Sequence, residues 1–398
     1  MQYEQELNKL TKLFDAGVFS APFYQKRGIQ RKVFSSYEEF KKLPFMTKRD
    51  IRSSSAFERS STSLENVYGL FSSSGTTGAK TFYVYSDEDR AVQESCARRF
   101  YSSLGVTSKD LGGVLAPVDT GVMAHTMMWQ YSAMGAGYVN CPVPSPDAVL
   151  DLVSSLPVSI LSSRPEVLTM VGLSASDASV LKNNHVRMLL PGGSFLSEAR
   201  RALLENLWGA NCYNMYGMSE VFGPLAGECR LQNGQHYPND LLFIELVDPE
   251  TQEPVAEGEM GVAVYTTLWA KGMPLIRYWT DDYMRVDSTP CACGSSMPRL
   301  FYCGRQADCI HLENGTILFP KDLEELIVPH GYVGGYRVFY ERGGVTRLEL
   351  ETARLQEVPD GSLIESVERF FRGPCQIKHV GFGAIGMSKV HFFTTEAR

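Results

Sequence analysis

One stretch of this chain, residues 72–80, reads Ser72-Ser73-Ser74-Gly75-Thr76-Thr77-Gly78-Ala79-Lys80. Its two glycines allow backbone N–H groups to turn toward an anion, and its hydroxyl groups supply further hydrogen-bond donors. Strand-like runs at 68–71 and 81–84 flank the stretch, so we expect a strand, a loop and a second strand. It is not a Walker loop, in which lysine directly follows glycine and precedes serine or threonine. Considered alone, it predicts either an anion-binding loop or an ordinary turn.

The composition of the chain is that of a globular protein. Hydrophobic residues make up 44% of the 398 positions and charged residues 21%, which suits two or three folded domains. The net charge of -7 argues against a nucleic-acid backbone as the partner. An anionic nucleotide can still bind such a chain, provided that local backbone N–H groups and a magnesium ion neutralise it.

Several features of the sequence predict a cytoplasmic protein. The first six residues lack the basic start and apolar run of a signal peptide. No run of about 18 apolar residues is present, so we expect no membrane-spanning helix and no membrane partner. Nine cysteines without a signal peptide indicate reduced thiols, including candidates for metal binding, rather than a disulfide framework.

Helical and strand-like patterns alternate through the middle of the chain, which is typical of an α/β sheet with helices on its faces. A β-rich segment follows between residues 242 and 268. Helices are expected at 87–104, 147–155, 165–171 and 197–207, and strands at 114–117, 158–161 and 187–190.

The pattern of residues 306–398 differs from the rest and predicts a small α+β unit. Glycine-containing turns indicate two hairpins, at 310–319 and 336–351. Pro320 stands where proline favours the start of a helix. Helices are therefore expected at 321–328 and 362–371, and final strands at 376–380 and 390–394.

The order of residues in the 72–80 stretch resembles the phosphate loop of adenylate-forming enzymes, the acyl/aryl-CoA ligase superfamily. Three later stretches resemble further motifs of that superfamily, in the same order. Residues 214–220 (Asn-Met-Tyr-Gly-Met-Ser-Glu) are similar to its Tyr-Gly-x-Ser/Thr-Glu motif, residues 277–282 (Arg-Tyr-Trp-Thr-Asp-Asp) to its aspartate motif, and residues 304–308 (Gly-Arg-Gln-Ala-Asp) to its hinge motif.

The resemblance is above all to the phenylacetate-CoA ligase branch, and it covers most of residues 20–330. Before its phosphate loop, that branch has a stretch similar to residues 43–50 of this chain. It also has the sequence Ser-Glu-Val at its glutamate motif and a Cys-x-Cys-Gly stretch before its hinge, and both are present here. The resemblance implies an α/β fold with two domains. A large, multi-sheet adenylation domain at 1–305 would bind ATP and a carboxylate, and a small α+β lid domain would occupy 306–398.

The resemblance also implies a reaction, in which a carboxylate attacks the α-phosphate of ATP and pyrophosphate leaves. Two anions must meet, so the site has to neutralise charge and fix positions. Tyr216 would lie against the adenine, with Gly217 beside it, and Ser219 would touch the α-phosphate. Glu220 would hold Mg²⁺, a hard cation that prefers oxygen ligands, and Asp282 would accept hydrogen bonds from the ribose hydroxyls.

The resemblance assigns further positions to the nucleotide. These residues would bind its phosphates, its adenine or its ribose. They are Ser74, Gly75, Thr76, Thr77, Gly78 and Lys80 for the phosphates, Gly192, Gly193 and Ser194 as a strand against the adenine, and Arg305 at the ribose or phosphate.

Two residues of the last domain have implied roles. Lys389 lies where the superfamily has a lysine that bridges the attacking carboxylate and the α-phosphate, although the residues before it differ from the usual Ser-Glu-Gly approach. An exposed strand lysine is the alternative for that position. Asp308 would be the hinge residue about which the lid rotates after adenylation.

The acid pocket of the superfamily corresponds to the segments near 119–139 and 192–225. Its candidate residues are aromatic or apolar, which predicts an aromatic or medium-sized apolar acid. For each of these residues, the alternative is that it packs in the core and does not contact the acid. They are Met123, His125, Trp129, Phe195, Met218, Phe222 and Pro224.

Three cysteines and one histidine predict a structural zinc site. Cys229 and His236 follow the glutamate motif, and Cys291 and Cys293 form a Cys-x-Cys before the hinge. Such a set would close a tetrahedral zinc site and leave no open position for substrate. The alternative is a group of buried, reduced thiols.

The sequence leaves the acyl acceptor open. The main hypothesis is transfer to the thiol of coenzyme A, and the nearest alternative is transfer to the phosphopantetheine arm of an acyl carrier protein or to another acceptor. A nucleotide-binding regulatory protein without catalysis is the alternative of another class. A homodimer is compatible with the sequence.

Overall fold

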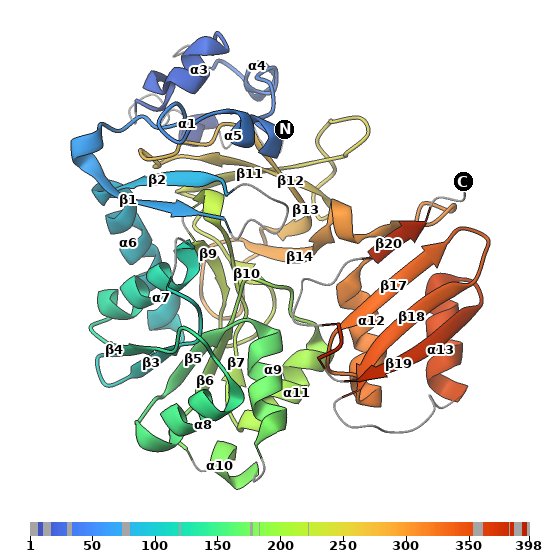
Figure 1. Cartoon of the computed structure of the whole chain (residues 1–398). Helices are drawn as coiled ribbons and strands as arrows, with labels where there is room; N and C mark the ends of the chain where they lie inside the picture. The colour runs from blue at the N-terminus through green and yellow to red at the C-terminus, as the bar shows by residue number, and fades with distance from the viewer. Residues whose placement is uncertain are drawn as a thin grey trace. The chain divides into compact units, whose positions relative to one another are not determined.

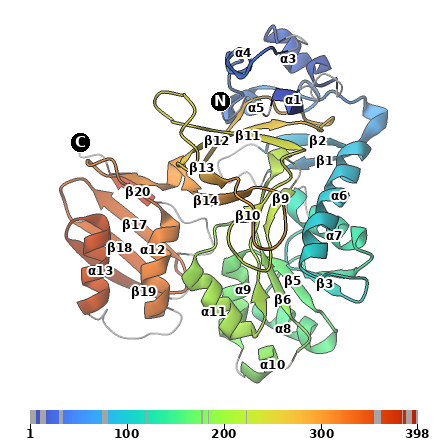
Figure 2. The ribbon, with the colours of Figure 1, turned by 180° about the vertical axis from the view of Figure 1, so that it is seen from behind.

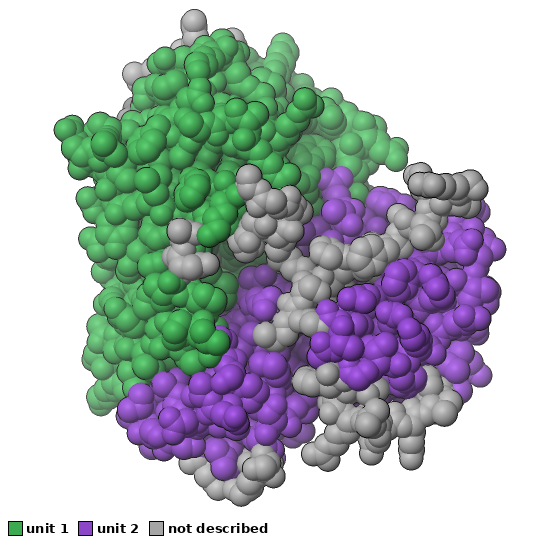
Figure 3. All heavy atoms as spheres, viewed as in Figure 1, with its two compact units in different colours: residues 1–143, 160–162, 213–301 green, residues 144–159, 163–212, 302–398 purple. Residues whose placement is uncertain are grey.

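The computed structural model (Figures 1 and 2) describes residues 7–10, 17–29, 34–73, 80–118, 121–175, 178–182, 184–221, 223–352, 361–381, 383–385 and 392–395. They belong to two compact units (Figure 3). Unit 1 comprises 1–143, 160–162 and 213–301, and unit 2 comprises 144–159, 163–212 and 302–398. Each unit consists of several separate segments of the chain, whereas the predicted domains are continuous. The predicted domain boundary at residue 305 therefore remains a prediction.

In unit 1, the 72–80 stretch joins two antiparallel strands, as predicted. β1 (Val67–Ser72) pairs with β2 (Phe82–Ser86), and the N–H of Ser73 donates to the carbonyl of Thr81 at 3.1 Å, a usual length for such a bond. β2 runs directly into α6 (Asp87–Ser103), which is the predicted helix at 87–104. The helix begins here because Ser86 and Asp89 form a capping box.

A second helix of unit 1, α7 (Val122–Ala133), was not predicted. Its apolar and polar residues are mixed around the helix, so no single-faced helical period marks it in the sequence. It packs closely on β3 (Leu111–Val114), where a side chain at Gly112 would come within 2.5 Å of the Tyr131 ring. The strand predicted at 114–117 lies three residues earlier, and Gly112 within it allows the close approach of the helix.

β3 pairs in parallel with β4 (Gly137–Asn140) and with β5 (Ile160–Ser163). A larger sheet of seven strands includes the predicted β-rich segment. Its strands lie in the order β11 (Leu242–Val247), β12 (Gly261–Thr267), β13 (Tyr278–Asp287), β14 (Arg299–Arg305), β10 (Gln235–His236), β9 (Gly223–Glu228) and β8 (Met215–Met218).

A buried ion pair attaches the N-terminal segment to this sheet. Nε of Arg277 donates to Oε2 of Glu245 at 3.2 Å, and both side chains are almost fully excluded from solvent. Nη1 of Arg277 donates to the carbonyls of Lys41 and Leu43, at 2.7 Å for the latter. The hydroxyl of Tyr37 donates to Glu245 at 2.8 Å, so the segment at 37–43 is held at two points.

The short elements of this segment are single helical turns or little more. They are α1 (Leu7–Leu10), η2 (Val18–Ser20), α3 (Pro22–Lys26), α4 (Tyr37–Phe40), α5 (Lys48–Ser53) and η3 (Leu64–Asn66).

The first part of unit 2 confirms the predicted helices of the middle of the chain. β6 (Met188–Pro191) pairs in parallel with β7 (Asn211–Cys212). The helices are α8 (Pro146–Ser155), α9 (Pro165–Ser174), α10 (Ala178–Lys182) and α11 (Glu198–Trp208).

The last part of unit 2 has the two predicted hairpins and two predicted helices, which confirms the α/β class with a small α+β end. Its sheet has the order β19 (Cys375–Gly381), β18 (Thr346–Thr352), β17 (Tyr336–Glu341) and β20 (Phe392–Thr395). Helices α12 (Pro320–Ile327) and α13 (Gly361–Phe371) lie on one face of it (Figures 1 and 2). The first hairpin consists of β15 (Ile310–His311) and β16 (Ile317–Leu318), and η6 (Val328–His330) follows α12.

A second buried ion pair joins α11 to α12 within unit 2. Arg200 donates to both carboxylate oxygens of Glu324, at 2.7 and 2.9 Å, and Ser197 donates to one of them at 2.8 Å. Glu325 accepts hydrogen bonds from the first backbone N–H groups of α11. In the part of the chain that the structure describes, no helix combines the length and apolar character that a membrane crossing needs.

We predict that Glu245→Ala lowers the free energy of unfolding by about 3–5 kcal/mol, because it leaves the Arg277 charge buried without its carboxylate. Urea unfolding measures the change. The double variant Glu245→Leu, Arg277→Met should lose less than the single one, since it leaves neither charge behind. A loss below about 1 kcal/mol for Glu245→Ala, the range of an exposed pair, would contradict the prediction.

Candidate active site

The β1–β2 hairpin carries the candidate phosphate loop. Ser72 ends the first strand and Ser73 follows it, and Lys80, which is exposed, precedes the second strand. The predicted ligands Ser74, Gly75, Thr76, Thr77 and Gly78 lie outside the described residues. The structure therefore gives the two ends of the loop, and the anion-binding role of the loop itself stays a prediction.

Glu220, the predicted magnesium ligand, lies in a short turn, η4 (Ser219–Val221), and is only 8% exposed. The hydroxyls of Tyr83 and Tyr278 both donate to its Oε1, at 3.3 and 3.1 Å. Among the described residues, no lysine or arginine forms an ion pair with it. A buried carboxylate held by two neutral donors is a suitable oxygen ligand for a hard cation.

Asp282 and Tyr216, 66 positions apart in the sequence, are hydrogen-bonded in unit 1. The Tyr216 hydroxyl donates to Oδ2 of Asp282 at 2.8 Å, and the Tyr265 hydroxyl donates to that of Tyr216 at 3.2 Å. Burial, followed by the charge of Asp282, raises the pKa of Tyr216 well above its usual value. The hydroxyl therefore keeps its proton and can hold the carboxylate in place.

The structure also distinguishes the two adjacent aspartates of the motif. Asp281 has a φ of +65°, its side chain is 38% exposed, and Lys48 lies 3.7 Å from it. Asp282 is only 2% exposed and faces Tyr216. The predicted choice of Asp282 thus agrees with its burial, although the structure does not test its contact with a ribose.

Three of the predicted pocket residues lie on α7. The His125 and Trp129 rings are 5.9 Å apart between centroids, and Met123, two residues before His125, is partly exposed. Two aromatic residues of β1 that were not predicted join them. Phe71 lies 5.2 Å from His125 and 5.7 Å from Trp129, and Tyr68 lies 5.0 Å from Trp129.

The other pocket candidates do not all lie with these. Met218 is partly exposed on β8, and Phe195 belongs to unit 2. Phe222 and the side chain of Pro224 lie outside the described residues. The sequence pattern did not indicate Tyr68 and Phe71, because residues three positions apart lie on opposite faces of a regular strand, and the register of β1 is irregular between Val67 and Gly69.

The predicted strand at Gly192, Gly193 and Ser194 was wrong. β6 ends at Pro191, and the backbone bends after Gly192, because Gly193 adopts a φ of +77° that a strand does not contain. Ser194 donates instead to Glu166 at 2.6 Å, within unit 2.

The hinge residues occupy the end of β14 and the turn after it, η5 (Gln306–Asp308). Arg305 and Asp308 are both partly exposed. Gly304 has no room for a side chain, since a Cβ there would come within 2.4 Å of the Phe319 ring. Lys389 lies outside the described residues, so its role remains a prediction.

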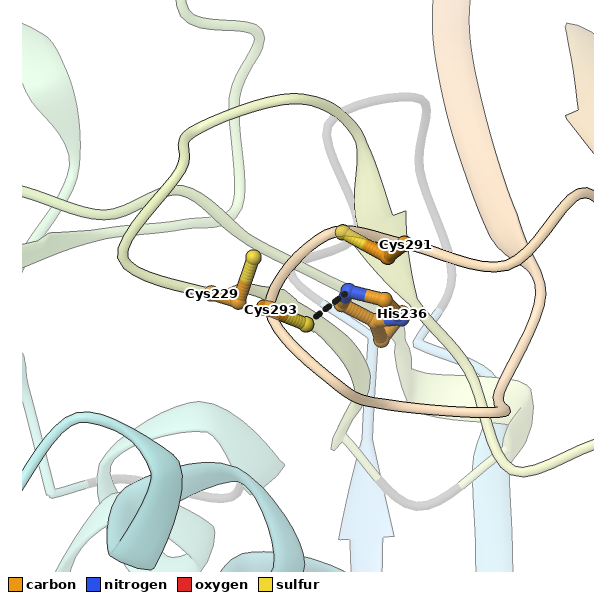
Figure 4. A group of neighbouring side chains, drawn as sticks. All are labelled: Cys229, His236, Cys291 and Cys293. Atoms are coloured by element: carbon orange, nitrogen blue, oxygen red, sulfur yellow. Dashed lines mark hydrogen bonds between the residues drawn. The ribbon is translucent and has the colours of Figure 1, made fainter.

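Cys229, His236, Cys291 and Cys293 come together in unit 1, as predicted (Figure 4). Their candidate ligand atoms all lie within 4.8 Å of one another. They belong to two segments, one around β10 and one between β13 and β14. Among the described residues, no other group of three or more such side chains has this spacing.

The environment of the cluster suits a metal-binding histidine. Nδ1 of His236 lies 2.9 Å from the Met297 carbonyl, which fixes the proton there and leaves Nε2, 3.4 Å from the Cys293 sulfur, free of that proton. Burial lowers the pKa of His236, which favours the neutral form that binds metals. Burial, with the neighbouring thiols, raises the pKa of Cys229 to about 11, so this thiol needs a cation beside it to ionise near neutral pH.

The sequence of this chain resembles those of known enzymes. Residues 22–272, more than half of the chain, match the AMP-binding enzyme family. The phenylacetate-coenzyme A ligase of Thermus thermophilus is 28% identical over 373 residues, which cover 88% of this chain and 78% of that protein. The phenylacetate-coenzyme A ligase of Escherichia coli is 26% identical over 386 residues, which cover 93% and 85%.

Solved structures resemble all or most of the chain. A 2-hydroxyisobutyryl-CoA ligase in complex with 2-HIB-AMP matches with a TM-score of 0.82, over 100% of this chain and 90% of the other, at 19% identity. An anthranilate CoA ligase matches with a TM-score of 0.62, over 79% and 63%, at 18% identity. At such identities the likeness concerns the fold alone.

Proposed function

The chain belongs to the AMP-binding enzyme family, and on this premise we propose that it is an AMP-forming acid–CoA ligase. It uses ATP to convert a carboxylic acid to an acyl-adenylate, releases pyrophosphate, and passes the acyl group to the thiol of coenzyme A. The observation that carries this proposal is the pair of buried carboxylates at the motif positions, Glu220 held by two tyrosines and Asp282 held by Tyr216. The phenylacetate-coenzyme A ligases that match most of the chain support the acid and the thiol as substrates.

Each motif residue then has a task in bringing two anions together. Asp282 accepts the ribose hydroxyls, and Tyr216 lies against the adenine. Glu220 holds Mg²⁺, which neutralises phosphate charge when bound. The hydroxyls and N–H groups of residues 74–78 hold the outer phosphates, and Lys389 bridges the carboxylate and the α-phosphate.

We further propose that the acid is aromatic or apolar. Phe71, His125 and Trp129 form a ring cluster with centroid distances of 5.2 to 5.9 Å, and such surfaces pack well against a flat or apolar side chain. The intact Glu220 and Asp282 argue against a regulatory protein without catalysis. The predicted homodimer and cytoplasmic location remain predictions.

Exchange of labelled pyrophosphate into ATP tests the first half-reaction. We expect exchange that depends on the added acid, and a panel of aromatic and aliphatic carboxylates shows which acid supports it. No exchange and no AMP with any acid of the panel would defeat the proposed function. Adding coenzyme A or a phosphopantetheine-bearing carrier protein then identifies the acceptor, and acyl transfer to the carrier alone would favour the alternative acceptor.

Replacement of Lys389 by alanine tests the predicted lysine. We expect pyrophosphate exchange to fall by about 100-fold or more, because the group that stabilises the developing charge is lost, while ATP binding stays nearly intact. The matched control is Lys378→Ala, an exposed lysine of β19 paired with Glu349, which should leave exchange unchanged. If Lys389→Ala keeps full pyrophosphate exchange, a group other than Lys389 stabilises the developing charge.

We also propose that Cys229, His236, Cys291 and Cys293 hold a structural zinc ion. Three sulfurs and one imidazole nitrogen make a closed tetrahedral set, so the metal supports the fold and takes no part in the reaction. It would connect the segment around β10 with the segment between β13 and β14.

Metal analysis of protein purified without chelators should find about one zinc per chain. Cys291→Ser should lower this content toward zero and lower the melting temperature, because the metal contributes to folding. Cys96→Ser, which changes a buried cysteine outside the cluster, should keep its zinc. Zinc near zero in the unchanged protein would contradict the proposal.

A further inference from the structure

Three tyrosine hydroxyls of unit 1 converge on the turn that carries Glu220. Tyr83 and Tyr85 are alternate residues of β2, so they point from the same face of that strand. Tyr278 is the first residue of β13. We call Tyr83, Tyr85 and Tyr278 the tyrosine clamp.

The clamp makes an asymmetric set of hydrogen bonds. Tyr83 and Tyr278 both donate to Oε1 of Glu220, at 3.3 and 3.1 Å. Tyr85 donates to the carbonyl of Ser219, one residue earlier, which fixes the backbone of the turn. Among the described residues, no hydrogen bond reaches Oε2 of Glu220, so one oxygen is saturated and the other is left for a ligand.

Burial makes these hydroxyls dependable donors. The three tyrosines are all buried, and Tyr278 is fully excluded from solvent. Little water therefore competes with Glu220 and Ser219 for these hydroxyl groups.

Tyr83 also contacts the base of the candidate phosphate loop. It pairs with Phe71 across the hairpin, two residues before Ser73, the last residue described before the loop. The N–H of Ser73 donates to Thr81 across the hairpin. One side chain thus links the carboxylate of Glu220 to the strand from which the loop begins.

We propose that the tyrosine clamp positions the divalent cation of adenylation, by saturating Oε1 of Glu220 and presenting Oε2 to the magnesium–nucleotide. The three tyrosines are positioning residues, because they act through Glu220 and the Ser219 backbone. The proposal rests on the proposed function, which gives Glu220 the magnesium ion. Partners of a metal ligand are expected to matter strongly, since their loss typically weakens metal binding by 10- to 100-fold.

The variants Tyr83→Phe and Tyr278→Phe remove one donor each and keep the ring. Tyr101→Phe is the matched control, because Tyr101 is also buried and its hydroxyl donates to Gln130 at 2.9 Å, in contact with none of the motif residues. Melting temperatures of all variants show whether each protein folds. If one clamp variant does not fold, the other carries the test.

The first measurement is acid-dependent pyrophosphate exchange over a range of Mg²⁺ concentrations. For both clamp variants we expect the Mg²⁺ concentration at half-maximal rate to rise by about 10-fold or more. Excess Mg²⁺ should restore most of the maximal rate, and the KM for the acid should stay unchanged. A purely structural role would lower the rate at every Mg²⁺ concentration, as would a general loss of folded protein.

The second measurement does not depend on activity. Mn²⁺ is titrated into the protein with ATP and without acid, and electron paramagnetic resonance reports the free ion. Weaker Mn²⁺ binding by Tyr83→Phe and Tyr278→Phe, with Tyr101→Phe unchanged, supports the clamp. Equal Mn²⁺ binding by all four proteins, or an unchanged Mg²⁺ dependence, overturns it.

The two measurements also separate this inference from the proposed function. If the unchanged protein shows no exchange with any acid but binds Mn²⁺–ATP more tightly than the clamp variants, the function fails and the clamp stands. If exchange occurs and its Mg²⁺ dependence is the same in every variant, the function stands and the clamp fails.

Discussion

The ion pair between Glu245 and Arg277 is the constraint on which the rest of unit 1 depends. Arg277 stands directly before Tyr278, and it reaches back to the carbonyls of residues 41 and 43. It does so with a φ of +49°, an uncommon conformation for a residue with a side chain. Because the pair is buried, it tolerates little displacement, and the start of β13 is therefore fixed relative to β11 and the N-terminal segment.

This constraint reaches the candidate site through β13. The strand begins at Tyr278, which holds Glu220, and contains Asp282, which faces Tyr216. The two motif carboxylates thus have a common support, although one lies on a turn and the other on a strand. Hydroxyl groups of buried tyrosines donate hydrogen bonds to both carboxylates. Carboxylate oxygens suit both a hard cation and ribose hydroxyls.

Local signals predicted much of the fold. The proline that begins α12 and the glycine turns of the last hairpins are signals from residues a few positions apart, and the elements that they predicted are present. Helix α7 was missed because its apolar residues are spread around the helix and form no single stripe. The strand at 192–194 was wrong because the bend at Gly193 ends β6 early. In both cases packing, rather than periodicity, decided the outcome.

The sequence by itself determined the family, the order of its motifs and the cysteine–histidine set, because each of these is a choice of residue types at short spacings. Only the tertiary structure decided which side chains meet. Tyr83 lies 137 positions from Glu220 and Tyr278 lies 58 positions from it, and no local pattern connects them. The tertiary structure also distinguishes the two adjacent aspartates, because Asp282 is buried and Asp281 is partly exposed. Contacts over such distances arise from the packing of sheets and helices, which residue spacing does not encode.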